Sequence, residues 1–155
     1  MTEEYFKNLI SKFEKSLSYT NRKLRGKIEL NYLYAAKNHK KIKLDEGKIG
    51  CYVFIYRNKA LKIGKAGLGS KDRFRYQHYL IKGAGSTLAK SLYGERKKLK
   101  INSSKKMISN WILKNTNRAN FILDEFNDGY LLNFFEAFLI VSLKPRYESK
   151  YGRKK

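Results

Sequence analysis

The sequence predicts an α+β fold: a small, mainly antiparallel sheet of three strands flanked by helices. Two segments rich in β-branched and aromatic residues, 51–56 and 60–64, are separated only by turn residues, which is typical of a β-hairpin. Apolar residues recur at helical spacing near the N-terminus, and a very apolar stretch at 130–143 predicts another helix. Apolar residues make up 42% of the 155 residues, enough for the core of one domain.

The first 46 residues are expected to form a basic helical extension that precedes the main domain at 47–155. An amphipathic helix is predicted up to Ser18, because apolar residues recur there every three or four positions with lysines and glutamates between them. A second apolar stretch, at 28–36, is also predicted to be helical. Basic runs lie on both sides of this stretch, and Gly47 marks the domain boundary.

The main domain is predicted to begin with the hairpin, whose strands are joined by a turn at 57–59. Helices are expected to start at Ser70 and at Ser86 or Thr87, because hydroxyls at those positions can accept hydrogen bonds from free backbone N–H groups. The elements that follow are a helix from Ser103 or Ser104 to Leu113, a third strand at 121–123 and the apolar helix at 130–143. Pro145, the only proline, marks the end of that last helix.

The charge of the chain points to a polyanionic partner. There are 35 lysines and arginines against 13 aspartates and glutamates, so the formal net charge is +22. Nucleic acid is the first partner to consider, because each phosphate that a cation neutralises releases condensed counterions. An anionic membrane is the weaker alternative, since it favours a basic amphipathic helix or a lipid anchor, and the sequence has no lipidation motif.

Other features narrow the class of protein. A single cysteine, Cys51, excludes an intrachain disulfide and a cysteine-rich zinc site. The N-terminus is acidic and does not read as a signal peptide. No uninterrupted apolar run is long enough to span a bilayer, so a soluble, cytoplasmic protein without a membrane partner is expected.

Four features along the main domain form a pattern: Gly50-Cys51-Tyr52, then Lys62-Ile63-Gly64-Lys65, then Arg73 and the isolated carboxylate Glu136. In order, spacing and predicted structure they resemble the GIY-YIG family of metal-dependent endonucleases, over about residues 50–148. The resemblance implies a small sheet flanked by helices. It also implies hydrolysis of a phosphodiester to a 5′-phosphate and a 3′-hydroxyl.

Glu136 is the residue to which the resemblance assigns the single divalent metal, Mg²⁺ or Mn²⁺. The helix around it is so apolar that an unpaired carboxylate there would be costly, and it needs a cation, a hydrogen-bond partner or access to solvent. The alternative is an ordinary glutamate on a polar stripe with Asn133. Magnesium suits a single carboxylate, because it keeps much of its hydration shell and also binds substrate phosphate.

Tyr52 is implied to act on the attacking water, either as general base or by positioning it. A phenol with the ordinary pKa of about 10 is a poor base at neutral pH. Positive neighbours are expected to lower that pKa, and Lys62 and Lys65 are the candidates. Lys62 stands where the family usually has tyrosine. A three-residue loop in the hairpin would place Tyr52 and Lys62 on one face of the sheet, whereas a two-residue loop would place them on opposite faces.

Arg73 is implied to bind the scissile phosphate, for which the fork of a guanidinium is well suited. Arg75 is the alternative, because Arg75 and Tyr79 also fit an arginine–x3–aromatic spacing seen in the family. His78 is a candidate to assist the base or contact phosphate, or else a packed or capping residue. Many family members have asparagine at the position of Glu148.

The function expected from these observations is a metal-dependent endonuclease that cuts DNA, of a restriction or defence type. A homodimer that cuts both strands of a palindrome is consistent with a short chain. Two alternatives remain open. One is a non-catalytic, basic nucleic-acid-binding protein, which the composition supports equally well, and the other is a homing or repair nuclease of the same fold.

Overall fold

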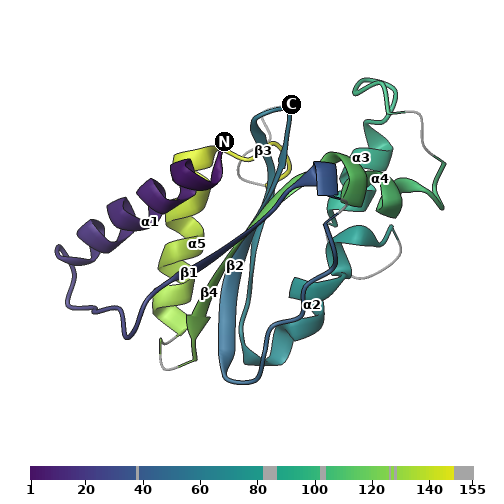
Figure 1. Ribbon diagram of the computed structural model, residues 1–155. Helices are drawn as coiled ribbons and strands as arrows, with labels where there is room; N and C mark the ends of the chain where they lie inside the picture. The colour runs from purple at the N-terminus through teal and green to yellow at the C-terminus, as the bar shows by residue number, and fades with distance from the viewer. Residues whose placement is uncertain (38, 82–86, 102–103, 126, 128, 149–155) are drawn as a thin grey trace.

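The computed structural model describes residues 1–37, 39–81, 87–101, 104–125, 127 and 129–148. Its α+β architecture confirms the predicted class, but the antiparallel sheet has four strands and not the predicted three (Figure 1). The strands are β1 (Glu29–Leu33), β2 (Lys48–Tyr56), β3 (Lys59–Ala66) and β4 (Asn117–Asp124), and they lie in the order β1-β4-β2-β3. β1 and β3 are therefore the edge strands.

The additional strand comes from the stretch at 28–36, for which the helix prediction is wrong. Residues 29–33 form β1, and a short 3₁₀ turn, Ala35–Lys37, comes after it. Leu30 and Tyr32 pack against the core while Glu29 and Asn31 are exposed, which is the period-two pattern of a half-buried strand. β4 offers a free edge to this segment, so tertiary pairing decides its conformation.

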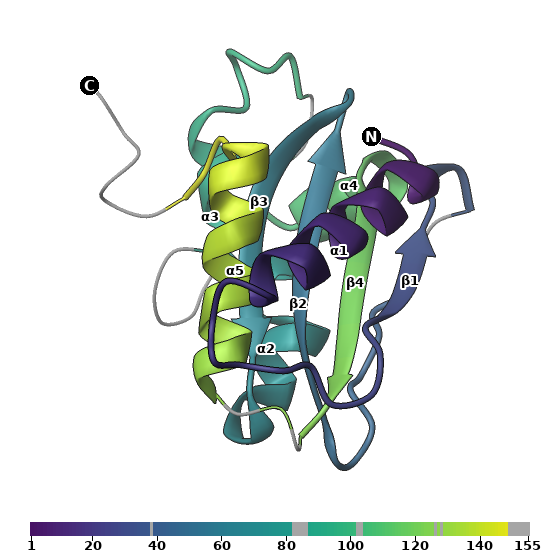
Figure 2. The same ribbon diagram turned by 90° about the vertical axis from the view of Figure 1, so that its left-hand side faces the viewer.

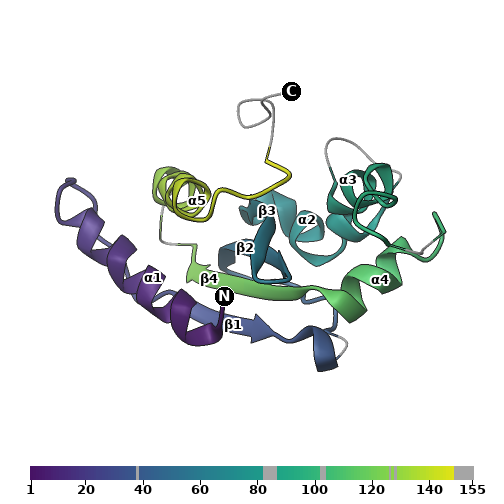
Figure 3. The ribbon, with the colours of Figure 1, turned by 90° about the horizontal axis from the view of Figure 1, so that it is seen from above.

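Helices cover both faces of the sheet (Figures 1 and 3). One face carries α1 (Glu3–Leu17) and α5 (Gly129–Leu143), and Figure 2 looks onto this face. The other face carries α2 (Lys71–Arg75), α3 (Leu88–Gly94) and α4 (Ile108–Asn115). In the described part of the chain, no helix has the length and apolar character needed to cross a membrane.

The two ends of the chain confirm their predicted helices. α1 is capped by Thr2, whose hydroxyl accepts a hydrogen bond from the backbone N–H of Tyr5 at 3.2 Å. Its apolar stripe is buried against the sheet and β1 pairs with β4, so α1 and β1 belong to the same sheet and hydrophobic core as the main domain. α5 matches the predicted apolar helix and ends just before Pro145.

The helices between the strands match the predictions less closely. Thr87 caps α3 as expected, accepting from the backbone N–H of Lys90 at 3.1 Å. Ser70 precedes α2 but its hydroxyl makes no capping hydrogen bond. α4 begins only at Ile108, and Ser104 lies before it, while Ser86 and Ser103 are outside the described residues.

Strand alternation divides the core into two. Cys51, Val53 and Ile55 point toward α1 and α5, whereas Tyr52 and Phe54 point toward α2, α3 and α4. This confirms the predicted alternation along β2. The second of these two cores is rich in aromatic rings and surrounds Tyr52.

The structure of the hairpin shows how many residues its loop has and on which faces Tyr52 and Lys62 lie. The loop has two residues, Arg57 and Asn58, and both have positive φ, 46° and 60°. Such a loop alone would place Tyr52 and Lys62 on opposite faces. A β-bulge intervenes where the register shifts between Phe54 and the residue after it, and it brings Lys62 opposite Phe54. Tyr52 and Lys62 therefore lie on the same face.

Candidate active site

Tyr52 lies at the centre of the candidate site, on the face of the sheet that α2, α3 and α4 cover. Its side chain is fully buried and packs edge-on against Phe54 and Phe74, with ring centroids 5.9 and 5.4 Å away. On β3 the ring lies across Gly64 so closely that a side chain at position 64 has no room. The glycine of the second motif thus has a defined role, which is to let the Tyr52 ring cross its strand.

His78 is brought directly to Tyr52. Its Nε2 is hydrogen-bonded to the Tyr52 hydroxyl, and its Nδ1 accepts from the backbone N–H of Leu88 at 3.4 Å. Burial, followed by the charges of Lys62 and Arg73, lowers the pKa of His78 from 6.5 to about 3, so the ring is neutral at pH 7. With Nδ1 occupied as an acceptor, the one ring proton is on Nε2, which donates to the Tyr52 oxygen.

Arg73 also lies beside Tyr52, and Arg75 does not. The Arg73 guanidinium, as a charge and a hydrogen-bond donor, pulls the pKa of Tyr52 down, but burial outweighs it and raises that pKa from 10.0 to about 12. Cations do act to lower the Tyr52 pKa, but they are Arg73 and Arg118 and not the expected Lys62 and Lys65, and burial leaves the pKa above its ordinary value. Arg75 is exposed on the same helix, and its charge acts on Tyr76 instead.

Arg118, which the sequence analysis missed, lies beneath this group. Its guanidinium is fully buried and lies 4.9 Å from the ring centroid of Tyr52 and 4.8 Å from that of Phe74. It donates to the Phe74 carbonyl at 2.6 Å and to the Tyr79 hydroxyl at 3.1 Å. The signal was available, because extending the alternation of the strand at 121–123 backward places Arg118 on the Tyr52 face.

Lys62 ties the C-terminal segment to the site. Its ammonium group donates to the Tyr147 carbonyl at 2.8 Å and lies 3.7 Å from Oε1 of Glu148, and its charge reaches His78. Glu148 thus lies near the cations around Tyr52. The lysine variant of the second motif has a carboxylate partner here.

Glu136 and Lys65 form a second group on the opposite face of the sheet. The Lys65 ammonium donates to Oε2 of Glu136 at 2.6 Å, and the side chains are 33% and 17% exposed for the lysine and the glutamate. Lys65 is paired with Cys51 across the hairpin, so it points toward α5 and away from Tyr52. Burial, and next the charge of Glu136, raises the pKa of the Cys51 thiol. Glu136 has thus found the cation that its apolar helix required.

The six predicted site residues therefore divide between the two faces of β3. Tyr52, Lys62, Arg73 and His78 are on one face, whereas Lys65 and Glu136 are on the other. The two groups lie at the same level, because the Tyr52 ring crosses Gly64 and Lys65 is the next residue of β3. β3 is an edge strand, and Arg73 is the exposed member of the first group, whereas Tyr52, Lys62 and His78 are buried.

The single carboxylate of Glu136 fits a weakly held, hydrated metal ion. The described residues contain no cluster of three or more histidine, cysteine, aspartate or glutamate side chains that could hold a metal. A single carboxylate that reaches solvent suits Mg²⁺ or Mn²⁺, provided that water and substrate oxygens supply the other ligands. Lys65 occupies one of the carboxylate oxygens.

Comparisons of the chain with protein-family models, with curated proteins and with solved structures found no match.

Proposed function

We propose that this protein is a metal-dependent endonuclease of the GIY-YIG type that hydrolyses phosphodiester bonds of DNA. The observation that carries the proposal is the grouping of Tyr52, His78 and Arg73 on one face of the edge strand, with Glu136 at the same level on its other face. A phenol, an imidazole, a guanidinium and a carboxylate around one strand supply a base, a phosphate-binding group and a metal ligand.

Tyr52 is the residue that handles the proton of the attacking water in this proposal. Its oxygen receives the Nε2–H of His78, and Arg73 lies beside it, so two donors favour the phenolate. Burial disfavours the phenolate and prevails in the protein alone, where the pKa of Tyr52 is about 12. The ionised fraction is small at neutral pH, so the rate of cutting is expected to rise as pH increases.

Arg73 is the phosphate-binding residue. It is exposed while the groups beneath it are buried, so its guanidinium can reach a phosphate at the surface. Its fork binds two phosphate oxygens and stabilises the charge that develops on them. Arg118 and Lys62 add positive charge below it, which favours an anion at this point of the surface.

Glu136 would hold the metal, Mg²⁺ or Mn²⁺. When bound, such an ion stabilises negative charge on the leaving oxygen as a Lewis acid. Lys65 holds the carboxylate in a fixed position at 2.6 Å and neutralises it. Lys62 has a supporting role, because its hydrogen bond to Tyr147 keeps the C-terminal segment beside the site.

The net charge of +22 supports DNA as the substrate, since a long duplex offers phosphates well beyond the reacting one. A restriction or defence setting in the cytoplasm is part of the proposal, and discrete fragments from a defined DNA would support it. A homodimer is the form that cuts both strands of a palindrome. The exposed Tyr130, Phe134 and Val141 on α5 offer a surface for it, and sedimentation on DNA tests this.

A second candidate function is non-catalytic binding of nucleic acid. Two observations favour it: Glu136 is already neutralised by Lys65, and Tyr52 is fully buried with a raised pKa. Both features are also compatible with an enzyme that completes its site on binding DNA and metal. Measurement of cutting and binding together separates the two functions.

The test uses supercoiled plasmid with Mg²⁺, comparing wild type, the Glu136→Ala variant and wild type with a chelator. Nicked, linear or discrete products from wild type alone would support the endonuclease. If wild type binds the plasmid tightly and in a salt-sensitive manner but leaves every DNA tested intact, the binding protein is the better description.

A further inference from the structure

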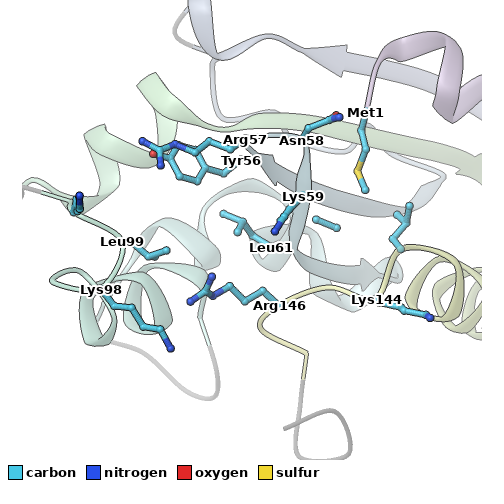
Figure 4. A pocket seen from close by; sticks show the side chains of 13 residues that line it. Met1, Tyr56, Arg57, Asn58, Lys59, Leu61, Lys98, Leu99, Lys144 and Arg146 are labelled. Carbon is cyan, nitrogen blue, oxygen red and sulfur yellow. The ribbon is translucent and has the colours of Figure 1, made fainter. Parts of the chain in front are cut away.

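A basic pocket lies at the turn end of the hairpin, away from the candidate site. It has a volume of about 610 Å³ and lies between the β2–β3 loop, the residues just after α3 and the end of α5 (Figure 4). Tyr56, Leu61 and Leu99 give it apolar walls. None of the proposed catalytic residues lines it.

The pocket is lined by six cations and by no carboxylate. They are Arg57, Lys59, Lys98, Lys100, Lys144 and Arg146. Of these six, Arg146 alone is ion-paired within the described ranges, through hydrogen bonds of 2.8 and 3.0 Å to Glu95. Figure 4 shows cationic side chains reaching the pocket from both of its sides. The pocket therefore favours an anion with more than one negative charge.

The backbone around the pocket is unusual in the same place. Across the described residues, four that are not glycine have positive φ: Arg57 (46°), Asn58 (60°), Lys100 (55°) and Lys144 (46°). All four line this pocket. The left-handed conformation favours glycine or asparagine, at hairpin loops and directly after helices alike. Three of the four positions nevertheless carry a cation at a conformational cost, which is typical of functional sites.

We propose that this pocket is a second phosphate-binding site, which holds the backbone of duplex DNA beside the reacting segment. The identity of the ligand as DNA rests on the proposed function, whereas the preference for phosphate rests on the pocket itself. The left-handed backbone at three of these positions sets the direction in which each cationic side chain leaves the chain, and all three line the pocket. This site positions the duplex and contributes affinity, and it contacts no reacting atom.

The spacing sets a minimum length of DNA. Tyr52 and Tyr56 are four residues apart on β2, which corresponds to about 13 Å at about 3.3 Å per residue. A duplex rises about 3.4 Å per base pair, so in a duplex that lies along β2 about four base pairs separate the reacting phosphate from those held in the pocket. In this orientation a duplex that ends closer than this to the cutting site does not reach the pocket.

The test is the Arg57→Asn/Lys144→Gly double variant, because each new residue suits the left-handed backbone at its position. Urea unfolding is expected to show equal or higher stability than wild type. The duplex has about 20 base pairs, or about two helical turns, and its Kd is expected to rise about tenfold. The slope of log K against log salt should fall by about 0.9 for each phosphate that the variant no longer neutralises. Lys12→Gln/Lys15→Gln removes the same charge from the exposed side of α1 and is expected to keep the wild-type slope.

Two outcomes would overturn the inference. One is a double variant that binds the long duplex with the wild-type Kd and slope. The other is an equal loss of affinity on duplexes too short to reach the pocket. The readout of this test is binding, so it is independent of cutting. If wild type does not cut DNA but the double variant binds the long duplex more weakly, the proposed endonuclease activity is refuted and the second phosphate-binding site is supported. If wild type cuts DNA but the double variant binds as wild type does, the endonuclease activity is supported and the second phosphate-binding site is refuted.

Discussion

The ring of Tyr52 lies across the backbone of Gly64 on the neighbouring strand. A Cβ at position 64 would lie 2.7 Å from Cζ and 3.0 Å from Cε2 of that ring, distances at which something must move. The same ring is packed edge-on against Phe74, so it cannot move away from Gly64 without displacing Phe74. The glycine of the second motif and the tyrosine of the first are therefore coupled by packing.

Gly64→Ala is accordingly expected to displace the Tyr52 hydroxyl from His78 and to lower the stability by about 1–3 kcal/mol. Cutting should fall by at least about a hundredfold, since misplacement by about 1 Å has that effect on a positioned group. The control is Gly67→Ala, because a Cβ there meets nothing within 4 Å and its φ is not positive. Equal cutting by the two variants would show that the packing has no bearing on activity.

Arg73→Ala and Arg75→Ala form a matched pair, because both remove one exposed cation from α2. Arg73→Ala should reduce single-turnover cutting about a hundredfold or more, because a donor to the developing phosphate charge is removed. Arg75→Ala should change it less than about threefold, as is usual for a surface charge. Should Arg75→Ala prove the more damaging of the two, the phosphate would have to be reassigned to Arg75.

Lys65→Met is expected to increase the affinity of Glu136 for metal in the absence of DNA. The ammonium at 2.6 Å competes with the ion for the carboxylate, so its removal should tighten Mn²⁺ binding about tenfold, or about 1.4 kcal/mol, in calorimetry. Lys48→Met is the control, because Lys48 donates to Asp124 at the same distance of 2.6 Å. Tightening of equal size in both variants would mean that any released carboxylate binds Mn²⁺ and that Glu136 is not special.

Stability is expected to fall in acid because of two buried histidines. The pKa values of His78 and His39 are lowered from 6.5 to about 3 and about 4, mainly by burial. Both stay neutral in the folded protein, whereas the unfolded chain takes up protons below pH 6.5. The two histidines therefore cost no stability above pH 6.5, and below it they lower the free energy of unfolding as pH falls toward 4 and 3, by about 2 kcal/mol per histidine at pH 5.

Urea unfolding at pH 7 and pH 5 measures this effect. His78→Gln should show a decrease in stability between the two values that is smaller than that of wild type by about 2 kcal/mol, and His39→Gln should behave alike. An unchanged decrease in both variants would show that other groups cause the acid sensitivity.

Much of the fold could be predicted because local pattern and tertiary packing agree. Helices α1 and α5 have clear periodicity or apolar length, and the hairpin is a compact pair of β-rich segments. The helix prediction at 28–36 is wrong because a short apolar run fits a strand or a helix equally well. Pairing with the free edge of β4 decides that it is a strand. The predicted third strand, at 121–123, is too short, because β4 begins at Asn117. Its first half carries Arg118 and Asn120, residue types that are rarely buried.

The sequence indicated most residues of the candidate site, but it did not indicate how they are arranged on the two faces of the sheet. The prediction that the length of the hairpin loop decides whether Lys62 faces Tyr52 is wrong, because a bulge reverses the effect of the two-residue loop. No pattern in the sequence indicates a bulge there. The pKa of Tyr52 depends on how deeply its neighbours bury it, and burial is a property of the packed core.

The central claim is that Tyr52 and Glu136, on opposite faces of one strand, act in the same reaction. Its most direct test is single-turnover cutting of a labelled duplex by wild type, Tyr52→Phe and Glu136→Gln, with Kd measured on the same samples. Both variants are expected to lose at least about a hundredfold in rate while each Kd stays within about threefold of wild type. Cutting by either variant at the wild-type rate would contradict it.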